Sequence, residues 1–380
     1  MIVKIGDVIS EYSVRNKFDE NIPVYSVTNE KGFCTGYFSK EVASKDKSTY
    51  KIVPRGYFAY NPSRINVGSV DWQKYEDRVI VSPLYVVFGV SDRLDRQYLL
   101  HYLKSDMMLS FIKEYATGSV RDNLKLADLG KFPINLRPVE EQHQIATTLD
   151  KIDDLIAKRR RQLDKLDELV KSRFIEMFVA TNVASEWPYC TIADISNEMR
   201  TGPFGSALHH DEFVDSGVFV LGIDNAVENR FSYNRMRYIT EEKYQQLKRY
   251  TVHPGDVIIT IMGTVGRSAV IPADMPKAIN TKHLACITPN VKMVNAQFLS
   301  CAFQIHPGIR TQLQNQSKGA IMDGLNLTII KGLAFRIPPI NLQNQFVEFY
   351  EQTDKSKLAI QKSLENLEIL KKALMQKYFG

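Results

Sequence analysis

Apolar residues between positions 138 and 178 repeat with the spacing of a coiled-coil helix. They follow alternating steps of three and four residues, which aligns them along one face of a helix. At about 1.5 Å per residue, a continuous helix over this range would extend for roughly 60 Å. The predicted seam consists of Leu149, Ile152, Ile156, Leu163, Leu166, Val170 and Met177, with Arg159 and Arg173 at its two remaining positions.

A second seam of the same kind lies near the end of the chain. Glu and Lys crowd its flanks, as expected of solvent-facing coil positions. Pro138 and Pro339 stand where each helix is expected to begin, because the first helical position needs no backbone N–H donor. Neither helix can bury its apolar seam alone, and a whole domain lies between the two helices in the sequence. We therefore expect an antiparallel pair related by a pseudo-two-fold axis. The second seam comprises Ile360, Leu364, Leu367 and Leu374.

The two helical segments belong to a longer internal repeat. Residues 118–126 match residues 319–327 without a gap, at an offset of 201 positions (319 − 118). The same offset carries Pro-Val-Glu-Glu-Gln-His-Gln-Ile, from Pro138, onto Pro-Ile-Asn-Leu-Gln-Asn-Gln-Phe, from Pro339. It still holds at the end of each repeat, where Phe178 maps onto Phe379. Upstream the match is looser, so the sequence indicates a tandem duplication whose first halves have diverged.

Short strands and turns dominate the two segments that precede the helices. β-branched or aromatic runs bounded by Pro, Gly or Asp predict strands, and helical apolar spacing predicts short helices at 96–115 and 296–314. The small, polar stretch 181–188 is the predicted linker. The clearest predicted strands are 79–81, 85–88, 257–261 and 269–271.

These patterns together predict an α+β fold. Two α/β domains are expected, separated by two long antiparallel coiled-coil helices in an internal repeat with pseudo-two-fold symmetry. The predicted domains are 1–137 (first variable domain), 138–180 (central coiled-coil helix), 181–337 (second variable domain) and 338–380 (C-terminal coiled-coil helix).

Composition narrows the class of protein. With 380 residues, 44% hydrophobic and 24% charged, the chain has the composition of a globular protein of two or three domains. Its four cysteines form no CxxC pair, which argues against a zinc cluster or a disulfide framework and favours a reducing cytoplasm. No apolar stretch is long enough to span a bilayer, so no membrane partner is expected. The net charge of +6 permits an anionic partner without requiring one.

The common catalytic motifs are missing. The sequence contains no Walker phosphate loop, no Gly-x-Gly-x-x-Gly, no His-Glu-x-x-His and no Gly-x-Ser-x-Gly. The loop 263–268 comes nearest to a phosphate cradle, but two glycines three apart between strands favour a hairpin turn. Asn61-Pro62-Ser63-Arg64 has only half of the base-binding motif of methyltransferases. His209 and His210 lack a further metal ligand. We therefore expect no catalytic residue and no metal site.

Polar and basic residues instead gather at glycine-punctuated loops of both variable segments. These residue types donate hydrogen bonds to phosphates and to base edges. Taken singly, each is also an ordinary surface residue. The candidate DNA-binding residues are Arg15, Lys31, Tyr60, Asn61, Arg64 and Asn66 in the first segment, and Ser206, His209, Arg235, Arg237, Thr264, Arg267, Lys282 and His283 in the second.

The layout of variable domain, helix, variable domain, helix resembles the specificity (S) subunit of type I restriction-modification systems. The resemblance covers essentially the whole chain. It rests on the repeated helical entry motif at Pro138 and Pro339, the Gly-Asp of 252–259 ahead of the 263–266 glycines, and the Leu-Gly-Ile-Asp of 221–224. The first variable domain departs most, with Arg-Gly-Tyr-Phe-Ala-Tyr at 55–60 where the second has Pro-Gly-Asp-Val-Ile-Ile at 254–259.

The resemblance implies a chain without catalysis. The variable domains 1–137 and 181–337 would be target recognition domains 1 and 2, each reading one half of a split, asymmetric double-stranded DNA sequence. The helices would act as a ruler between the half-sites. Two modification subunits would bind S-adenosylmethionine and methylate adenine. Restriction subunits would use ATP and Mg for translocation and cleavage. This chain would hold these partners and bind no cofactor itself.

Two other classes of function remain open at this stage. A coiled-coil adaptor with two protein-binding domains would also explain the helices and the modest charge, and it predicts no salt-dependent DNA binding. A stand-alone nuclease or methyltransferase would turn over substrate by itself, but its motifs are absent.

Overall fold

The computed structural model describes residues 1–36, 46–116, 123–204, 207–317 and 325–380. The chain forms two compact units, Met1–Arg160 with Gln361–Gly380, and Arg161–Ile360. The fold is α+β, as predicted. Most of the matched repeat segment at 118–126 and 319–327 lies outside the described residues.

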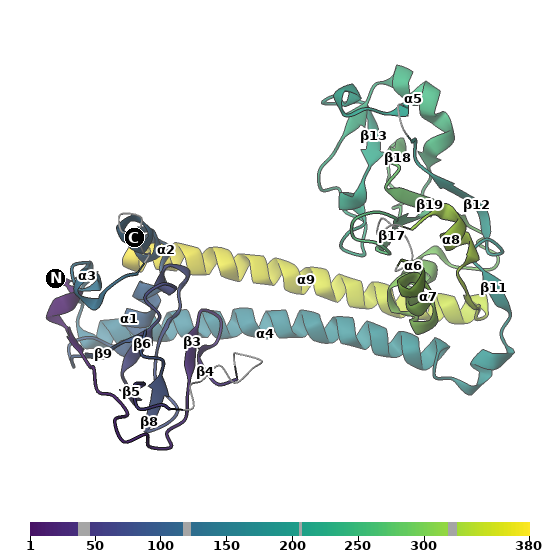
Figure 1. The fold of residues 1–380 in the computed structure, drawn as a ribbon. Coiled ribbons are helices and arrows are strands. Elements are labelled where there is room, and N and C mark those ends of the chain that lie inside the picture. The colour runs from purple at the N-terminus through teal and green to yellow at the C-terminus, as the bar shows by residue number, and fades with distance from the viewer. Residues whose placement is uncertain (37–45, 117–122, 205–206, 318–324) are drawn as a thin grey trace. The chain divides into compact units, whose positions relative to one another are not determined.

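The first unit combines small sheets with three short helices and the ends of two long ones (Figure 1). Its largest sheet has the strand order β2-β9-β6-β7, and β1-β10, β3-β4 and β5-β8 form two-stranded sheets. Its elements are β1 (Ile2–Lys4), β2 (Ile9–Glu11), β3 (Ser26–Thr28), β4 (Gly32–Cys34), β5 (Lys51–Pro54), β6 (Phe58–Tyr60), β7 (Val70–Trp72), β8 (Arg78–Val81), β9 (Val86–Val90), α1 (Arg96–Leu103), α2 (Asp106–Ala116), α3 (Leu126–Leu129) and β10 (Pro133–Asn135).

The second unit contains a sheet of the same topology. The order β12-β19-β16-β17 repeats β2-β9-β6-β7, and a further sheet has the order β14-β13-β18-β15. Its elements are β11 (Tyr189–Thr191), β12 (Ser196–Thr201), β13 (Val218–Leu221), β14 (Tyr238–Ile239), α5 (Glu241–Leu247), β15 (Thr251–Val252), β16 (Val257–Thr260), β17 (Ser268–Val270), β18 (Ala278–Asn280), β19 (Leu284–Pro289), α6 (Ala296–Ile305), α7 (Pro307–Ser317), α8 (Leu327–Gly332) and β20 (Ala334–Arg336).

Two long helices, α4 (Val139–Phe178) and α9 (Ile340–Phe379), confirm the predicted pair. They begin 201 positions apart (340 − 139) and have the same length, 40 residues. In the first unit, ion pairs of 2.5 Å and 2.8 Å join α4 to α9, and they show that the two helices run antiparallel. In the second unit another ion pair joins the helices. The pairs are Asp153–Lys371 and Arg160–Glu368 in the first unit, and Asp167–Lys357 in the second.

The seam positions are buried to different degrees. On α4 the seam residues are most buried towards the two helix ends, where the sheet domains cover them, and they are half-buried in the middle of the helix. On α9 the seam residues are half-buried. Arg173 is exposed, and its neighbour Phe174 is buried in its place, because Phe174 packs with Phe178, Phe298 and Phe346 in the core of the second unit. Leu149, Ile152, Ile156 and Val170 are buried; Leu163, Leu166, Ile360, Leu364, Leu367 and Leu374 are half-buried.

A buried glutamine fixes the start of each long helix. Gln142 accepts a hydrogen bond from the backbone N–H of Asp95 (2.8 Å), and its amide donates to the carbonyl oxygens of Arg93 and Arg137. Gln343 makes the equivalent three bonds in the second unit. Both side chains are fully buried. The glutamine shared by the two entry motifs therefore ties each long helix to the loop before α1 or α6.

Each predicted short helix is in fact two helices. Residues 96–115 divide into α1, which ends at Leu103, and α2, which begins at Asp106. The hydroxyl of Ser105 accepts a hydrogen bond from the Met108 N–H (3.2 Å) and so caps the start of α2. Residues 296–314 divide into α6 and α7 at His306-Pro307. The predicted strands are confirmed as β8, β9, β16 and β17. Within the described residues, no helix is both long enough and apolar enough to cross a membrane.

Candidate nucleic-acid interface

Three strands of the second unit meet at one end of its repeated sheet. β12 ends at Thr201, opposite Ala285, and β16 ends at Thr260, opposite Leu284. Since both are antiparallel to β19, they end where β19 begins. The Ile261 N–H donates to the His283 carbonyl oxygen (2.9 Å), which holds the next residues together. Segments 202–204, 261–267 and 281–283 therefore leave the sheet side by side.

The neighbouring sheet adds two more segments at the same place. β13 ends at Leu221, opposite Asn280, and the Thr281 N–H donates to the Leu221 carbonyl oxygen (2.9 Å). β14 is antiparallel to β13, so the residues that precede it come to the same end. The second candidate interface consists of 202–204, 222–225, 235–237, 261–267 and 281–283.

This interface collects most of the residues predicted for the second segment. Arg235, Arg267 and Lys282 are exposed, and within the described part of the chain no ion pair engages them. Arg237 is instead paired with Asp224 and is only 22% exposed, so its charge is largely neutralised by the protein. Burial, followed by the positive charges of Lys282 and Arg237, lowers the pKa of His283. The second candidate interface therefore presents three exposed cationic side chains together with the imidazole of His283, whose lowered pKa favours the neutral form.

The loop between β16 and β17 is a rigid glycine turn. Gly263 and Gly266 have φ of 72° and 83°, which favours glycine and confirms the predicted hairpin turn. The Thr260 hydroxyl accepts from the Arg267 N–H (2.9 Å) and donates to the Thr264 carbonyl oxygen. Arg267 also lines a pocket of about 250 Å³ together with Arg310, Asn229 and Gln304. The backbone thus holds Thr264 and Arg267 in place while their side chains stay exposed.

The first unit has the same arrangement of strand ends. β2 ends at Glu11, opposite Phe88, and β6 ends at Tyr60, opposite Val86, so both end where β9 begins. Residues 61–69 join β6 to β7, as 261–267 join β16 to β17. This loop also closes on a glycine with positive φ, Gly68 at 85°. Two loops predicted from sequence as candidate sites are therefore structurally equivalent.

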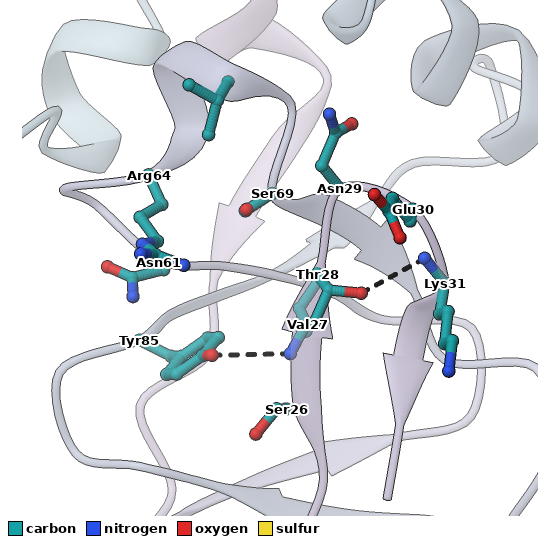
Figure 2. A pocket seen from close by; sticks show the side chains of 11 residues that line it. Ser26, Val27, Thr28, Asn29, Glu30, Lys31, Asn61, Arg64, Ser69 and Tyr85 are labelled. Carbon is teal, nitrogen blue, oxygen red and sulfur yellow. Dashed lines mark hydrogen bonds between the residues drawn. The ribbon is translucent and has the colours of Figure 1, made fainter. Parts of the chain in front are cut away.

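A pocket of about 690 Å³ lies where this loop meets the β3–β4 hairpin (Figure 2). Asn61, Arg64 and Lys31 line it, with Tyr85 on one wall. The Tyr85 hydroxyl accepts a hydrogen bond from the Val27 N–H (3.4 Å), and burial raises the pKa of Tyr85. Arg64 and Lys31 are exposed and have no ion-pair partner among the residues that the structure describes. The pocket therefore combines two cations and the carboxylate of Glu30 with amide and hydroxyl groups.

Two further predicted residues lie beside this pocket. Arg15 forms a β-bridge with Lys51, whose ammonium group donates to the Tyr85 carbonyl oxygen (2.6 Å). Asn66 lies in the 3-10 helix of the 61–69 loop and is half-buried. The first candidate interface is defined by Arg15, the pocket residues and the 61–69 loop.

The structure does not place every predicted residue in these interfaces. Tyr60 is fully buried in the core, and its hydroxyl donates to the Leu124 carbonyl oxygen (3.1 Å), because β6 lies between β9 and β7. His209 lies elsewhere: its backbone N–H donates to Glu212, which pairs with Lys243 on α5 (2.5 Å). Burial therefore excludes Tyr60 as a DNA contact. His209 is exposed but lies outside the segments that define the second interface, and its DNA contact stays a prediction. Ser206 lies outside the described residues.

Other lining residues were not predicted from the sequence. Asn29, Glu30 and Tyr85 line the first pocket, and Arg310 and Gln304 line the second. Tyr85 lies at the start of a predicted strand and Arg310 in a predicted helix. The local sequence pattern at these residues therefore predicts secondary structure and gives no sign of a binding role. Nowhere in the described ranges do three or more His, Cys, Asp or Glu side chains gather in a way that would hold a metal ion.

Comparison with known proteins agrees with this architecture. The family described as Type I restriction modification DNA specificity domain matches residues 2–168 and 185–370. The EcoBI type I restriction enzyme specificity subunit of Escherichia coli is 23% identical over 360 residues, covering 86% of this chain and 74% of that protein. The MjaIX specificity subunit of Methanocaldococcus jannaschii is 21% identical over 299 residues, covering 75% and 68%.

Solved structures show the same fold. The type I restriction-modification S subunit from M. genitalium superposes with a TM-score of 0.62 at 15% identity, covering all of this chain and 96% of that one. A chain from a study of complex assembly in the type I restriction-modification system gives a TM-score of 0.57 at 16% identity, covering 100% and 97%. The chain therefore belongs to the type I restriction-modification DNA specificity family, as a specificity subunit with two copies of the domain that takes part in recognising a DNA target.

Proposed function

We propose that this chain reads a split, asymmetric double-stranded DNA sequence, one half-site with each candidate interface. The observation that carries the proposal is the equivalence of the two interfaces. Both lie where strands of one sheet topology end, and both present polar groups and cations that form no ion pair with any residue the structure describes. Their side chains differ, however: Asn61 and Arg64 stand in one loop, Thr264 and Arg267 in the other. Two similar frames with different side chains suit two different half-sites.

We further propose that α4 and α9 set the spacing between the half-sites. A 40-residue helix extends for about 60 Å, enough to separate two recognition domains by about one turn of DNA, ~34 Å. Insertion of part of a heptad into one helix should change the spacer and leave both half-sites intact. Altered half-sites with an unchanged spacer would contradict the proposal that the two helices set the spacing.

The chain would act as the non-catalytic subunit of a larger complex. Two modification subunits and the restriction subunits would dock on it, and these partners would bind S-adenosylmethionine, ATP and Mg. The cytoplasm, where the DNA lies, is the proposed location. This part of the proposal is based on the family to which the chain belongs, because the relatives are named as specificity subunits of restriction enzymes.

Methylome sequencing tests the proposal directly. A host without adenine methylation would express the cognate modification subunit with and without this chain. We expect a split adenine-methylation motif only when this chain is present. Exchange of residues 1–137 for those of a relative should change one half of the motif. A stable complex that yields no motif would favour the adaptor function instead.

A matched pair of arginine variants separates recognition from general charge. Arg64→Ala should weaken or relax the first half-site by about 1–3 kcal/mol. Arg55→Ala is the control: Arg55 is also exposed, but it lies before β6, at the other end of the strand, and pairs with Asp77 (3.7 Å). Equal losses from both variants would show that only overall charge matters.

A further inference from the structure

Three large apolar side chains are exposed in the second candidate interface. Met236 is 54% exposed, and its sulfur accepts a hydrogen bond from the Tyr238 hydroxyl (2.9 Å). The other two are Phe204 and Met262. Phe204 is 55% exposed and Met262 is 38% exposed. Phe204 follows β12 and Met262 follows β16, the two strands that flank β19. They therefore leave the sheet on either side of the 281–283 turn. Both side chains are therefore accessible to a ligand that reaches this end of the sheet.

Backbone contacts fix the segments that carry these side chains. A Cβ at Gly202 would lie 2.1 Å from the Asn280 carbonyl oxygen, so only glycine permits the packing of 202–204 against the turn. On the other side, the Ile261 N–H bonds the His283 carbonyl oxygen at 2.9 Å. Both segments are thus held against one turn by their main chains, which leaves Phe204 and Met262 free to contact a ligand.

The charges around this apolar pair favour a nucleic acid as that ligand. Lys282 lies on the turn between the two segments, and Arg267 lies on the Met262 loop. Both are exposed and, within the described ranges, neither forms an ion pair. Cations beside apolar groups complement the edge of a DNA groove, where phosphates flank the bases. An apolar protein surface would leave these two charges unmatched.

The first unit repeats the feature at the equivalent strand ends. Val14 follows β2, Val67 lies in the 61–69 loop, and Leu84 precedes β9. These side chains are 48%, 51% and 77% exposed. At this end of the repeated sheet, both units therefore carry exposed apolar side chains and exposed cations, with different residues in each.

The geometry points to Phe204 and Met262 as apolar readers of the second half-site, in contact with the C5-methyl group of a thymine. That methyl is the apolar group that base pairs present in the major groove. The inference rests on the proposed function and extends it, because it assigns part of the readout to non-polar contact. It predicts that the second half-site contains a thymine on one of its strands.

Thymine-to-uracil exchange tests this assignment, since uracil lacks only the methyl group. Once methylome sequencing has given the motif, duplexes with single uracil substitutions would be titrated with the complex of this chain and its modification subunit. For the natural chain, one substitution in the second half-site should weaken binding roughly fourfold, the effect of one buried methyl group. In Phe204→Ala or Met262→Ala that penalty should disappear.

Val291→Ala provides the matched control. Val291 is 74% exposed and follows the far end of β19, away from the interface, so this variant should keep the uracil penalty. A penalty unchanged in both Phe204→Ala and Met262→Ala, or no uracil penalty with the natural chain, would overturn the assignment while the split motif remained. Failure of the natural chain to give any motif would overturn the proposed function itself.

Discussion

The buried glutamine at the start of α9 gives the sharpest test of the folding argument. Gln343→Met keeps the length of the side chain and removes its three hydrogen bonds. The Asn295 N–H (2.9 Å) and the carbonyl oxygens of Met293 (3.0 Å) and Pro338 (2.8 Å) then lose their partner inside the protein. Each buried group left without a partner costs about 1–3 kcal/mol. We expect an overall loss of about 3–5 kcal/mol of unfolding free energy.

Calorimetry and hydrogen exchange would measure this loss. For a unit of this size, each kcal/mol lowers Tm by about 2–4 °C, so Gln343→Met should lower it by roughly 6–20 °C. Hydrogen-exchange mass spectrometry should show faster opening in the second unit, and Gln142→Met should have the same effect in the first. Gln345→Met, an exposed position two residues along α9, is the control. A change below about 1 kcal/mol in Gln343→Met would refute the reasoning.

Three further predictions concern the second unit. Arg267→Ala should relax one position of the second half-site by about 1–3 kcal/mol if Arg267 contacts a base, whereas uniform weakening of all sequences in the methylome would identify a phosphate contact. Asp256→Asn should lower the unfolding free energy by about 3–5 kcal/mol, because the buried guanidinium of Arg200 (2.7 Å away) loses its buried counter-charge and keeps only the exposed Glu198 at 3.5 Å; urea unfolding would measure the change. Burial lowers the pKa of His306, so the unfolded chain takes up this proton at higher pH than the folded chain does, and stability should fall as pH drops below about 6.5. Thermal unfolding at pH 7.5 and 5.5, with His306→Phe for comparison, should show a smaller pH effect in the variant.

The long helices were predictable because their apolar period is a local property of the sequence. Leu149, Ile152 and Ile156 repeat at helical spacing whatever the rest of the chain does. The break between α6 and α7 also has a local signal, since Pro307 suits the first position of a new helix. The shift of the seam from Arg173 to Phe174 had no such signal. It depends on Phe298 and Phe346, which only the folded unit brings to that helix face.

The candidate interfaces were predictable in part. Glycine loops rich in Arg and Asn mark exposed turns, and the structure places Asn61, Arg64 and Arg267 on such turns. Tyr60 shows the limit of that reasoning. One residue separates a buried strand position from an exposed loop position, and the difference depends on which strands flank β6. The pairing of Arg237 with Asp224, which neutralises its charge, likewise appears only in three dimensions.

The internal repeat explains why some segments of the two halves match and others differ. Gln142 and Gln343 bond the same three kinds of backbone group, so an exchange at either position would leave buried groups without partners. The loop side chains at the strand ends face solvent, so their exchange leaves the sheet and the helix entry intact. The buried residues that hold the sheet and the helix entry can therefore stay the same while the exposed loop side chains change. One half of the chain can acquire new contacts in this way without altering the other half. That independence is what recognition of two unlike half-sites by one chain requires.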